Sequence, residues 1–356
     1  QDRMIIGYDR FVFEVLFFGE LILGGLFILA VVLGIGRVLI VLLLALLALI
    51  RDLRHPSPIM TAATGPTVTV LVAAYNEGKV IARTMESIMK SRYAIKELIV
   101  IDDGSTDDTL SVARQALARI EGPKSKKRRI RILHQENAGK SAALNHGIEY
   151  ATGDVLVCLD ADTIAAPDAI GRLVAHFADE RVGGVAGNIK VGNRSNLLTK
   201  WQAIEYITSQ NLDRRAGDLV NAVTVIPGAL GAWRASAVSE DGDFVTDTLA
   251  EDMDLTWRLR RAGYRMVNEG DAIGYTEVPD TYRSFIKQRM RWSFGSLQCL
   301  YKHRSALFRY GWFGRFALTS LWIFQFLFQV IAPLVDIQIL FLAALFLNAY
   351  TASGLH

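Results

Sequence analysis

Apolar residues gather at the two ends of the chain and leave a charged, mixed region between them. Residues 11–50 are nearly all apolar, and about 20 such residues are enough to span a bilayer. We therefore expect N-terminal membrane helices within residues 1–55, in two pieces hinged near Gly34, Gly36 and Arg37. Because the second piece is short for a full span, one crossing followed by an interfacial helix is the alternative.

The second apolar stretch covers residues 312–350 and is interrupted by Pro333, which predicts C-terminal transmembrane helices on either side of the proline. Before it, residues 281–310 mix aromatic and aliphatic side chains with Arg and Lys, as amphipathic helices of the membrane interface do. Basic residues such as Arg51 and Arg304 flank the two apolar stretches. Positive residues mark the cytoplasmic side, so we expect a multi-pass protein of the cell membrane with a cytoplasmic middle region.

The middle region, residues 65–280, alternates strand and helix patterns. Residues 67–77 form an apolar strand followed by polar residues, and residues 78–90 have a helical pattern. The same design returns in residues 96–109. Strands that alternate with helices at this spacing predict βαβ units, and hence an α/β domain with a mostly parallel sheet.

One strand carries the first candidate chemistry. Residues 155–163 are an apolar run that ends in Asp160 and Asp162. In open α/β sheets, ligands bind beyond the carboxyl ends of the strands, and two carboxylates there suit Mg²⁺ or Mn²⁺ together with substrate phosphates. The alternative is an acidic turn that merely closes the strand, and this pair by itself would favour that interpretation.

Three later segments add candidates, and the first two have a plainer alternative. Gly228 lies in an apolar, glycine-rich segment that suits close approach of the backbone to a ligand, or is an ordinary loop. Glu251 and Asp252 begin a predicted helix, where acids also favour the helix dipole. A further group falls within about one helical turn: Gln288, Arg291 and Trp292.

Composition narrows the classes of partner. The formal net charge is +3, which argues against nucleic acid as the main partner. The only cysteines, Cys158 and Cys299, have no second ligand at metal spacing. A disulfide framework is excluded, and a reducing compartment is compatible with the sequence.

Several short motifs stand in one order along the chain: AAYNE, IDDGST, GKSAALN, LDADT, PGALGAWR, AEDMDL and QRMRW. Together they resemble the family 2 glycosyltransferases, and among these the membrane-embedded processive synthases of cellulose, chitin, hyaluronan and poly-N-acetylglucosamine. The resemblance covers residues 67–303 and the flanking membrane helices. It implies a nucleotide-sugar-binding fold of the GT-A type, with a mixed, mostly parallel sheet.

For the nucleotide, the resemblance implies five contacts. Ala73, Tyr75 and Glu77 would lie around the uracil and the ribose. Asp103 would also hold the nucleotide, and Lys140 would contact it near the phosphates.

For the diphosphate, the resemblance implies a divalent ion, Mg²⁺ or Mn²⁺, on Asp160 and Asp162. Gln288 and Arg291 would contact the diphosphate directly. A metal ion and an arginine stabilise the charge of a departing nucleoside diphosphate.

For the acceptor, the resemblance places Trp292 against the terminal sugar, with Glu251 and Gly228 beside it. Asp252 would be the general base. Inverting transfer needs such a base to take a proton from the acceptor hydroxyl, and a tryptophan face stacks well on a sugar ring.

The sequence therefore predicts a processive, inverting β-glycosyltransferase that polymerises a UDP-sugar at the cytoplasmic face and exports the polysaccharide. The segments VGGVAGNIKVGNR and VIPGALGAWRASAV look more like N-acetylglucosamine polymerisers than cellulose synthases, which favours UDP-N-acetylglucosamine over UDP-glucose. The rival functions are a non-processive transferase to a lipid acceptor and a silent subunit that binds nucleotide-sugar. The short membrane part leaves room for a homo-oligomer, or for an accessory export or deacetylase partner.

Overall fold

The computed structural model describes residues 2–56, 59–61, 63–120 and 129–352. The chain forms two compact units. One comprises the residues up to Val41 together with those from Thr319 onwards, and the other is Leu42–Leu318. The second unit holds the sheet and every residue that the sequence analysis nominated for chemistry.

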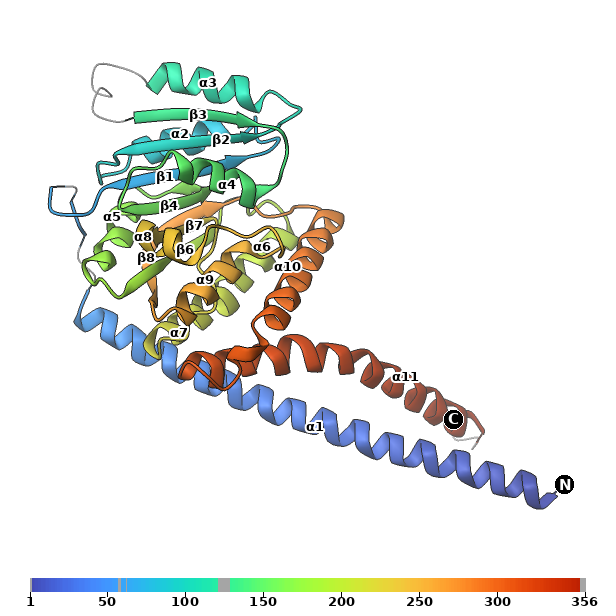
Figure 1. Cartoon of the computed structure of the whole chain (residues 1–356). Helices are drawn as coiled ribbons and strands as arrows, with labels where there is room; N and C mark the ends of the chain where they lie inside the picture. Colours follow the sequence, from blue (N-terminus) through green and yellow to red (C-terminus); the bar gives the residue numbers. More distant parts are fainter. Residues whose placement is uncertain (1, 57–58, 62, 121–128, 353–356) are drawn as a thin grey trace. The chain divides into compact units, whose positions relative to one another are not determined.

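The described part of the larger unit is built on an eight-stranded sheet in the order β3-β2-β1-β4-β7-β6-β8-β5 (Figure 1). Neighbouring strands among β1 to β4 are parallel, as are β6 and β8, whereas β7 runs antiparallel to both its neighbours and β5 runs antiparallel to β8. The predicted mixed, mostly parallel sheet is confirmed. The strands are β1 (Val68–Ala74), β2 (Glu97–Asp103), β3 (Arg129–Gln135), β4 (Val155–Asp160), β5 (Ile164–Ala165), β6 (Val182–Val191), β7 (Leu230–Arg234) and β8 (Arg265–Thr276).

Helices cover both faces of this sheet, because successive strand residues point to opposite sides. Val70 and Val72 of β1 pack in one core with residues of α2, α3 and α5. Leu71, between them, packs in a second core with residues of α4 and α9. The helices of this unit are α2 (Ile81–Met89), α3 (Thr109–Ile120), α4 (Lys140–Glu149), α5 (Ala169–Ala175), α6 (Leu197–Glu205), α7 (Leu212–Leu219), α8 (Ala235–Asp241), α9 (Glu251–Arg261) and α10 (Tyr282–Lys302).

Short helical segments complete the larger unit. One of them, η2 (Tyr206–Asn211), is a π-helical stretch between α6 and α7. The others are η1 (His176–Ala178), η3 (Arg304–Ala306) and η4 (Phe313–Leu318).

The first apolar stretch forms one continuous helix, α1 (Asp2–Arg54). The hinge expected near Gly34, Gly36 and Arg37 is therefore wrong at the level of secondary structure. Glycine lowers helix propensity by only about 1 kcal/mol, and in apolar surroundings a helix satisfies every backbone hydrogen bond. The number of membrane crossings stays a prediction.

The second apolar stretch also differs from the expectation. Pro333 lies inside α11 (Phe328–Ala352) and does not separate two helices, as membrane helices tolerate. The π-helical segment η5 (Leu321–Leu327) precedes α11. Near it, Arg37 Nε donates to Ser320 Oγ at 2.9 Å, within the smaller unit.

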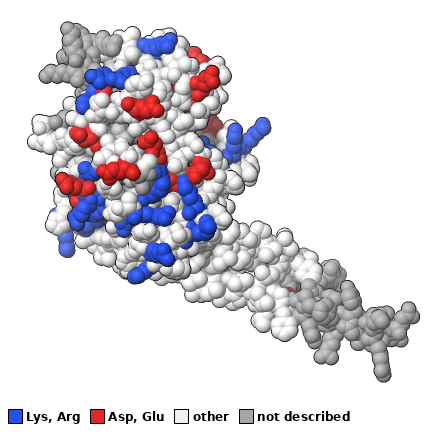
Figure 2. All heavy atoms as spheres, viewed as in Figure 1, with Lys and Arg blue, Asp and Glu red and all other residues white. Residues whose placement is uncertain are grey.

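Two helical stretches among the described residues are long and apolar enough to cross a membrane, Phe17–Arg54 and Phe313–Ala344. Their mean hydropathies reach 2.9 and 2.1. On the face shown in Figure 2, charged side chains gather on the larger unit, and the described part of the smaller unit is almost entirely uncharged. Both observations agree with the expected membrane segments at the two ends of the chain.

Candidate active site

Three parallel strands bring polar residues to one edge of the sheet. β1 lies between β2 and β4, and Ala73 of β1 is paired with Asp160 of β4. Parallel strands end on the same side, where ligands of open α/β sheets bind. Tyr75, Asp103 and Asp160 accordingly line one cavity of about 580 Å³.

The structure brings every nominated residue to this cavity. The nominated residues come from the ends of β1, β2 and β4 and the residues just after them, the start of α4, the loop before β7, the start of α9, and α10. Those predicted from the sequence are Ala73, Tyr75, Glu77, Asp103, Lys140, Asp160, Asp162, Gly228, Glu251, Asp252, Gln288, Arg291 and Trp292. Their roles toward substrate stay predictions.

Lys140 connects the two acidic groups of the cavity. Its Nζ donates a hydrogen bond to Asp160 Oδ1 and lies 3.5 Å from Glu251 Oε1. Burial alone would lower the pKa of Lys140, but the two carboxylates raise it well above its ordinary value. A Cβ at Gly228 would lie 2.6 Å from the same Nζ. A side chain at position 228 would therefore force the Lys140 ammonium to shift from its present position.

The acids that follow β1 and β4 carry excess negative charge. Asp162 Oδ1 accepts a hydrogen bond from Thr276 Oγ1 at 3.0 Å. Burial and the charge of Asp160 raise the pKa of Asp162 to about 6. Burial, with Asp162 and Asp160 nearby, raises the pKa of Glu77 to about 7. A cation bound at this place would relieve the repulsion that these shifts report.

The donor set determines which cation fits. Among the described residues, no three His, Cys, Asp or Glu side chains are grouped as a metal site. Mg²⁺ and similar ions often take only one or two carboxylates and complete their coordination with substrate phosphates and water. The pair Asp160 and Asp162 fits an ion of this kind, bound together with a diphosphate.

Asp252 stands at the first turn of α9. Its Oδ2 accepts from the Gly228 N–H at 3.1 Å, and its Oδ1 accepts from the Met253 N–H at 2.8 Å. Burial and the neighbouring charge of Glu251 raise the pKa of Asp252 to about 6. A carboxylate with a pKa near neutrality is well suited to take a proton during a reaction.

Helix α10 contributes the cluster that its spacing predicted. Gln288, Arg291 and Trp292 are three and four residues apart, so they share one side of the helix, and all three line the cavity. The Oε1 atom of Gln288 is buried and has no hydrogen-bond donor within the described part of the chain. Buried polar atoms are normally paired, and a hydroxyl or N–H of a ligand would supply this partner.

Ion pairs and close packing hold helices α9 and α10 together. Asp254 is fully buried and accepts from Lys302 Nζ at 2.9 Å and His303 Nε2 at 2.8 Å. Burial opposes ionisation, but these hydrogen bonds hold the pKa of Asp254 well below its usual range. A Cβ at Gly295 of α10 would lie 2.9 Å from Ala250, directly before α9. The packing fixes the acids of α9 relative to α10.

The Asp103 carboxylate accepts several hydrogen bonds that the sequence did not predict. Its Oδ1 accepts from the Ala138 N–H and its Oδ2 from the Gly139 N–H, both at 2.9 Å. Gln135 Nε2 donates to the same carboxylate at 2.8 Å. Asp103 therefore shapes the loop that places Lys140 at the start of α4.

The sequence analysis missed the wall formed by η2. Tyr206 and Gln210 of this π-helical turn line the cavity. Burial raises the pKa of Tyr206 to about 12, so its hydroxyl stays a donor. The available signal was two polar-tipped residues four apart in a predicted helix, which share a helix face.

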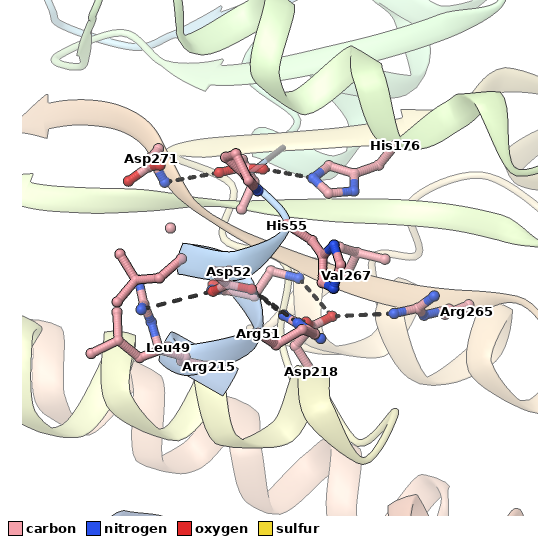
Figure 3. Close-up of a pocket in the computed structure, with 15 residues that line it drawn as sticks. Leu49, Arg51, Asp52, His55, His176, Arg215, Asp218, Arg265, Val267 and Asp271 are labelled. Atoms are coloured by element: carbon pink, nitrogen blue, oxygen red, sulfur yellow. Dashed lines mark hydrogen bonds and ion pairs between the residues drawn. The ribbon is translucent and has the colours of Figure 1, made fainter. Parts of the chain in front are cut away.

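A second cavity of about 390 Å³ lies where the end of α1 meets α7 and β8 (Figure 3). Arg51 NH2 is 2.6 Å from Asp218 Oδ2, and His176 Nε2 is 2.7 Å from Glu269 Oε2. Asp52 lies 3.8 Å from Arg215. These acids have basic partners, whereas acids outnumber bases among the residues that line the first cavity.

Comparison with known proteins identifies the lineage. Residues 69–237 match the model of Glycosyl transferase family 2, and residues 155–353, more than half of the chain, match that of Glycosyl transferase family group 2. The chain belongs to family 2 of the glycosyltransferases. It is therefore a glycosyltransferase, as the motifs indicated.

Relatives and a solved structure refine this placement. The chain is 37% identical over 234 residues to the poly-beta-1,6-N-acetyl-D-glucosamine synthase of Staphylococcus aureus, which covers 65% of this chain and 55% of that protein. Identity to the synthase of Staphylococcus epidermidis is 32% over 235 residues. The chain thus spans about half the length of these curated relatives.

A mannosyltransferase from Pyrobaculum calidifontis, solved with GDP-Man and Mn²⁺, superposes with a TM-score of 0.69 at 24% identity. The match covers 92% of this chain and 91% of that one. The expected GT-A fold is confirmed.

Proposed function

We propose that this glycosyltransferase polymerises a UDP-sugar processively and with inversion at the cytoplasmic face, and exports the polysaccharide. UDP-N-acetylglucosamine is the favoured donor, supported by the similarity to the poly-beta-1,6-N-acetyl-D-glucosamine synthases. The observation that carries the proposal is the layout of one cavity. It holds a carboxylate pair, Asp160 and Asp162, a separate buried carboxylate, Asp252, and an arginine and a tryptophan of α10.

In the reaction, Asp252 takes the proton of the acceptor hydroxyl. The hydroxyl oxygen forms a bond to the anomeric carbon while the bond from that carbon to the diphosphate oxygen breaks, and the electron pair leaves with UDP. The pKa of about 6 leaves Asp252 ionised at neutral pH, with enough basicity to accept the proton. Its two backbone hydrogen bonds, from Gly228 and Met253, fix the direction of the carboxylate.

The diphosphate would lie beside Asp160, at the end of β4. Lys140 and Arg291 supply positive charge to the departing UDP. A divalent ion, Mg²⁺ or Mn²⁺, would be held by Asp160 and Asp162, and would supply further charge to the leaving diphosphate. Tyr75 and Glu77 lie in the part of the cavity that would receive the nucleoside.

The membrane arrangement is part of the same proposal. Residues 1–55 and 312–350 would be membrane segments, residues 65–280 the cytoplasmic catalytic domain, and residues 281–310 the interface segment. The apolar lengths of Phe17–Arg54 and Phe313–Ala344 support this division. A second copy or an accessory chain would complete an export path.

The test is UDP release by the purified protein in lipid, with a panel of UDP-sugars and either Mn²⁺ or Mg²⁺, followed by sizing of the product. We expect release with UDP-N-acetylglucosamine and a long polymer. Release with UDP-glucose would overturn the donor assignment, and a single-sugar lipid product would overturn processivity. UDP binding without release under any metal would contradict the enzymatic proposal and favour a silent subunit.

A further inference from the structure

Arg289 sits inside the QRMRW motif at a position to which the motif assigns no contact. The residues described as lining the cavity include its neighbours Gln288 and Arg291 but not Arg289. Its guanidinium instead lies over the ring of Trp292, with Cζ 4.6 Å from the ring centroid. The same Cζ is 4.8 Å from the centroid of Phe285, one turn earlier. Arg289 therefore supports the tryptophan from behind the cavity wall.

A carboxylate on another helix holds this guanidinium in place. Arg289 NH1 donates to Glu205 Oε1 at 2.6 Å, and NH2 donates to Oε2 at 2.7 Å. Such a two-pronged pair fixes the plane of the guanidinium as well as its position. The side chains of Arg289 and Glu205 are 23% and 38% exposed, so the geometry of the two hydrogen bonds, more than burial, fixes the pair.

Glu205 also connects two walls of the cavity. It is the last residue of α6 and is followed directly by Tyr206, the first residue of η2 and a lining residue. The pair thus joins the wall that carries Trp292 to the wall that carries Tyr206. A change in either helix would move the indole relative to the general base.

We propose that Arg289, held by Glu205, is a positioning residue that sets the orientation of the Trp292 indole for the acceptor sugar. The inference rests on the proposed function, in which Trp292 meets the acceptor. A guanidinium over one face of the indole leaves the other face for the sugar. Arg289 contacts no reacting group and acts only through the tryptophan.

The test compares variants of the full chain in lipid. Arg289→Met removes the charge, Arg289→Lys keeps the charge without the planar fork, and Arg283→Met changes an exposed arginine of the same helix as a control. We expect Arg289→Met to shorten the polymer by about tenfold through misplacement of the acceptor, while the donor KM stays within about twofold. Arg289→Lys should be intermediate, and the control should match the unmodified protein.

Fluorescence quenching reports how exposed the Trp292 indole is, and the measurement requires no enzymatic activity. Acrylamide quenching of Trp292, taken as the difference between each protein and its Trp292→Phe counterpart, should increase in Arg289→Met and in Glu205→Gln. Unchanged quenching would overturn the proposal, as would a donor KM that rises as much as polymer length falls. Because quenching needs no product, it tests the proposal even if the protein makes no polymer, a result that would refute only the proposed function.

An exchange of charges separates positioning of the indole from simple tethering of two helices. Glu205→Arg combined with Arg289→Glu restores an ion pair but places a carboxylate against the ring. We expect the polymer to stay short, since an anion is repelled by an aromatic face. Full recovery would overturn the proposal, because a tether alone would then suffice. UDP binding by each variant verifies that it is folded, and Glu205→Gln carries the test if Arg289→Met does not fold.

Discussion

The two cavities of the larger unit contain the same kinds of residue and balance them in opposite ways. The residues lining the first include seven acids, Glu77, Asp103, Asp160, Asp162, Glu251, Asp252 and Glu277, and two strong bases, Lys140 and Arg291. The second includes four acids, Asp52, Asp218, Glu269 and Asp271, and three arginines with two histidines. Each acid of the second has an Arg or His nitrogen within 4.0 Å. Acids thus greatly outnumber strong bases in the first cavity, whereas each acid of the second has a basic partner.

This difference is the basis for proposing a catalytic role for the first cavity and a structural role for the second. In the first cavity burial and mutual repulsion raise the pKa of Glu77, Asp162 and Asp252. A bound cation, or a proton taken up during the reaction, would stabilise these carboxyl groups. In the second cavity the charge is already satisfied, and the ion pairs fix the end of α1 to α7 and β8 (Figure 3).

The largest expected effect is that of Asp252→Asn. The amide keeps the shape of the side chain and cannot accept the proton, so UDP release should fall by about 10³-fold. UDP binding should persist, because Asp252 is not among the residues proposed to hold the nucleotide or the metal ion. The matched control is Asp271→Asn, whose carboxylate lines the second cavity and is 73% exposed. Turnover equal in the two variants would end the assignment of Asp252 as base.

A smaller effect is expected from pH. The pKa of Asp252 is raised, so its protonation begins at higher pH than that of an ordinary aspartate, and the base form is lost as pH falls through about 6. UDP release should then decline by about tenfold per pH unit on the acid side. Glu251→Gln removes a neighbouring charge that raises this pKa. The acid limb of its pH profile should move to lower pH, and a limb that stays in place would refute the electrostatic explanation.

The smallest effect on turnover is expected in the second cavity. Asp218→Asn weakens the ion pair between the buried Asp218 and Arg51, whose side chain is 35% exposed, and should lower the free energy of unfolding by about 1 kcal/mol. A fall in Tm would report this loss, while UDP release per folded molecule should stay within about twofold. A normal Tm with strongly reduced release would mean that the second cavity takes part in the chemistry.

The motifs predicted which residues lie together in one cavity, because their positions follow from the sheet. Asp160 ends a strand next to β1, so the sequence order and parallel pairing bring it to Ala73 and Tyr75. The spacing of Gln288 and Arg291 likewise placed both on one side of a helix. Local patterns of this kind need no knowledge of distant contacts.

Contacts between elements far apart in the chain could not be read in this way. The pair Arg289 and Glu205 joins residues whose proximity depends on how α6 and α10 pack. The π-helical turn at Tyr206 has no strong local signal. The hinge expected at Gly34 is absent because the need of an apolar segment to satisfy its backbone hydrogen bonds outweighs the low helix propensity of glycine.

The most direct test of the proposed site for a metal-bound diphosphate in the first cavity is calorimetry of UDP binding with and without Mn²⁺. The unmodified protein should bind UDP tightly only with the metal, and Asp160→Asn combined with Asp162→Asn should lose this dependence and most of the affinity. Asp252→Asn and Asp218→Asn should retain both. UDP binding that is unchanged in the Asp160 and Asp162 double variant would contradict the claim that the uncompensated carboxylates of the first cavity receive a metal-bound diphosphate.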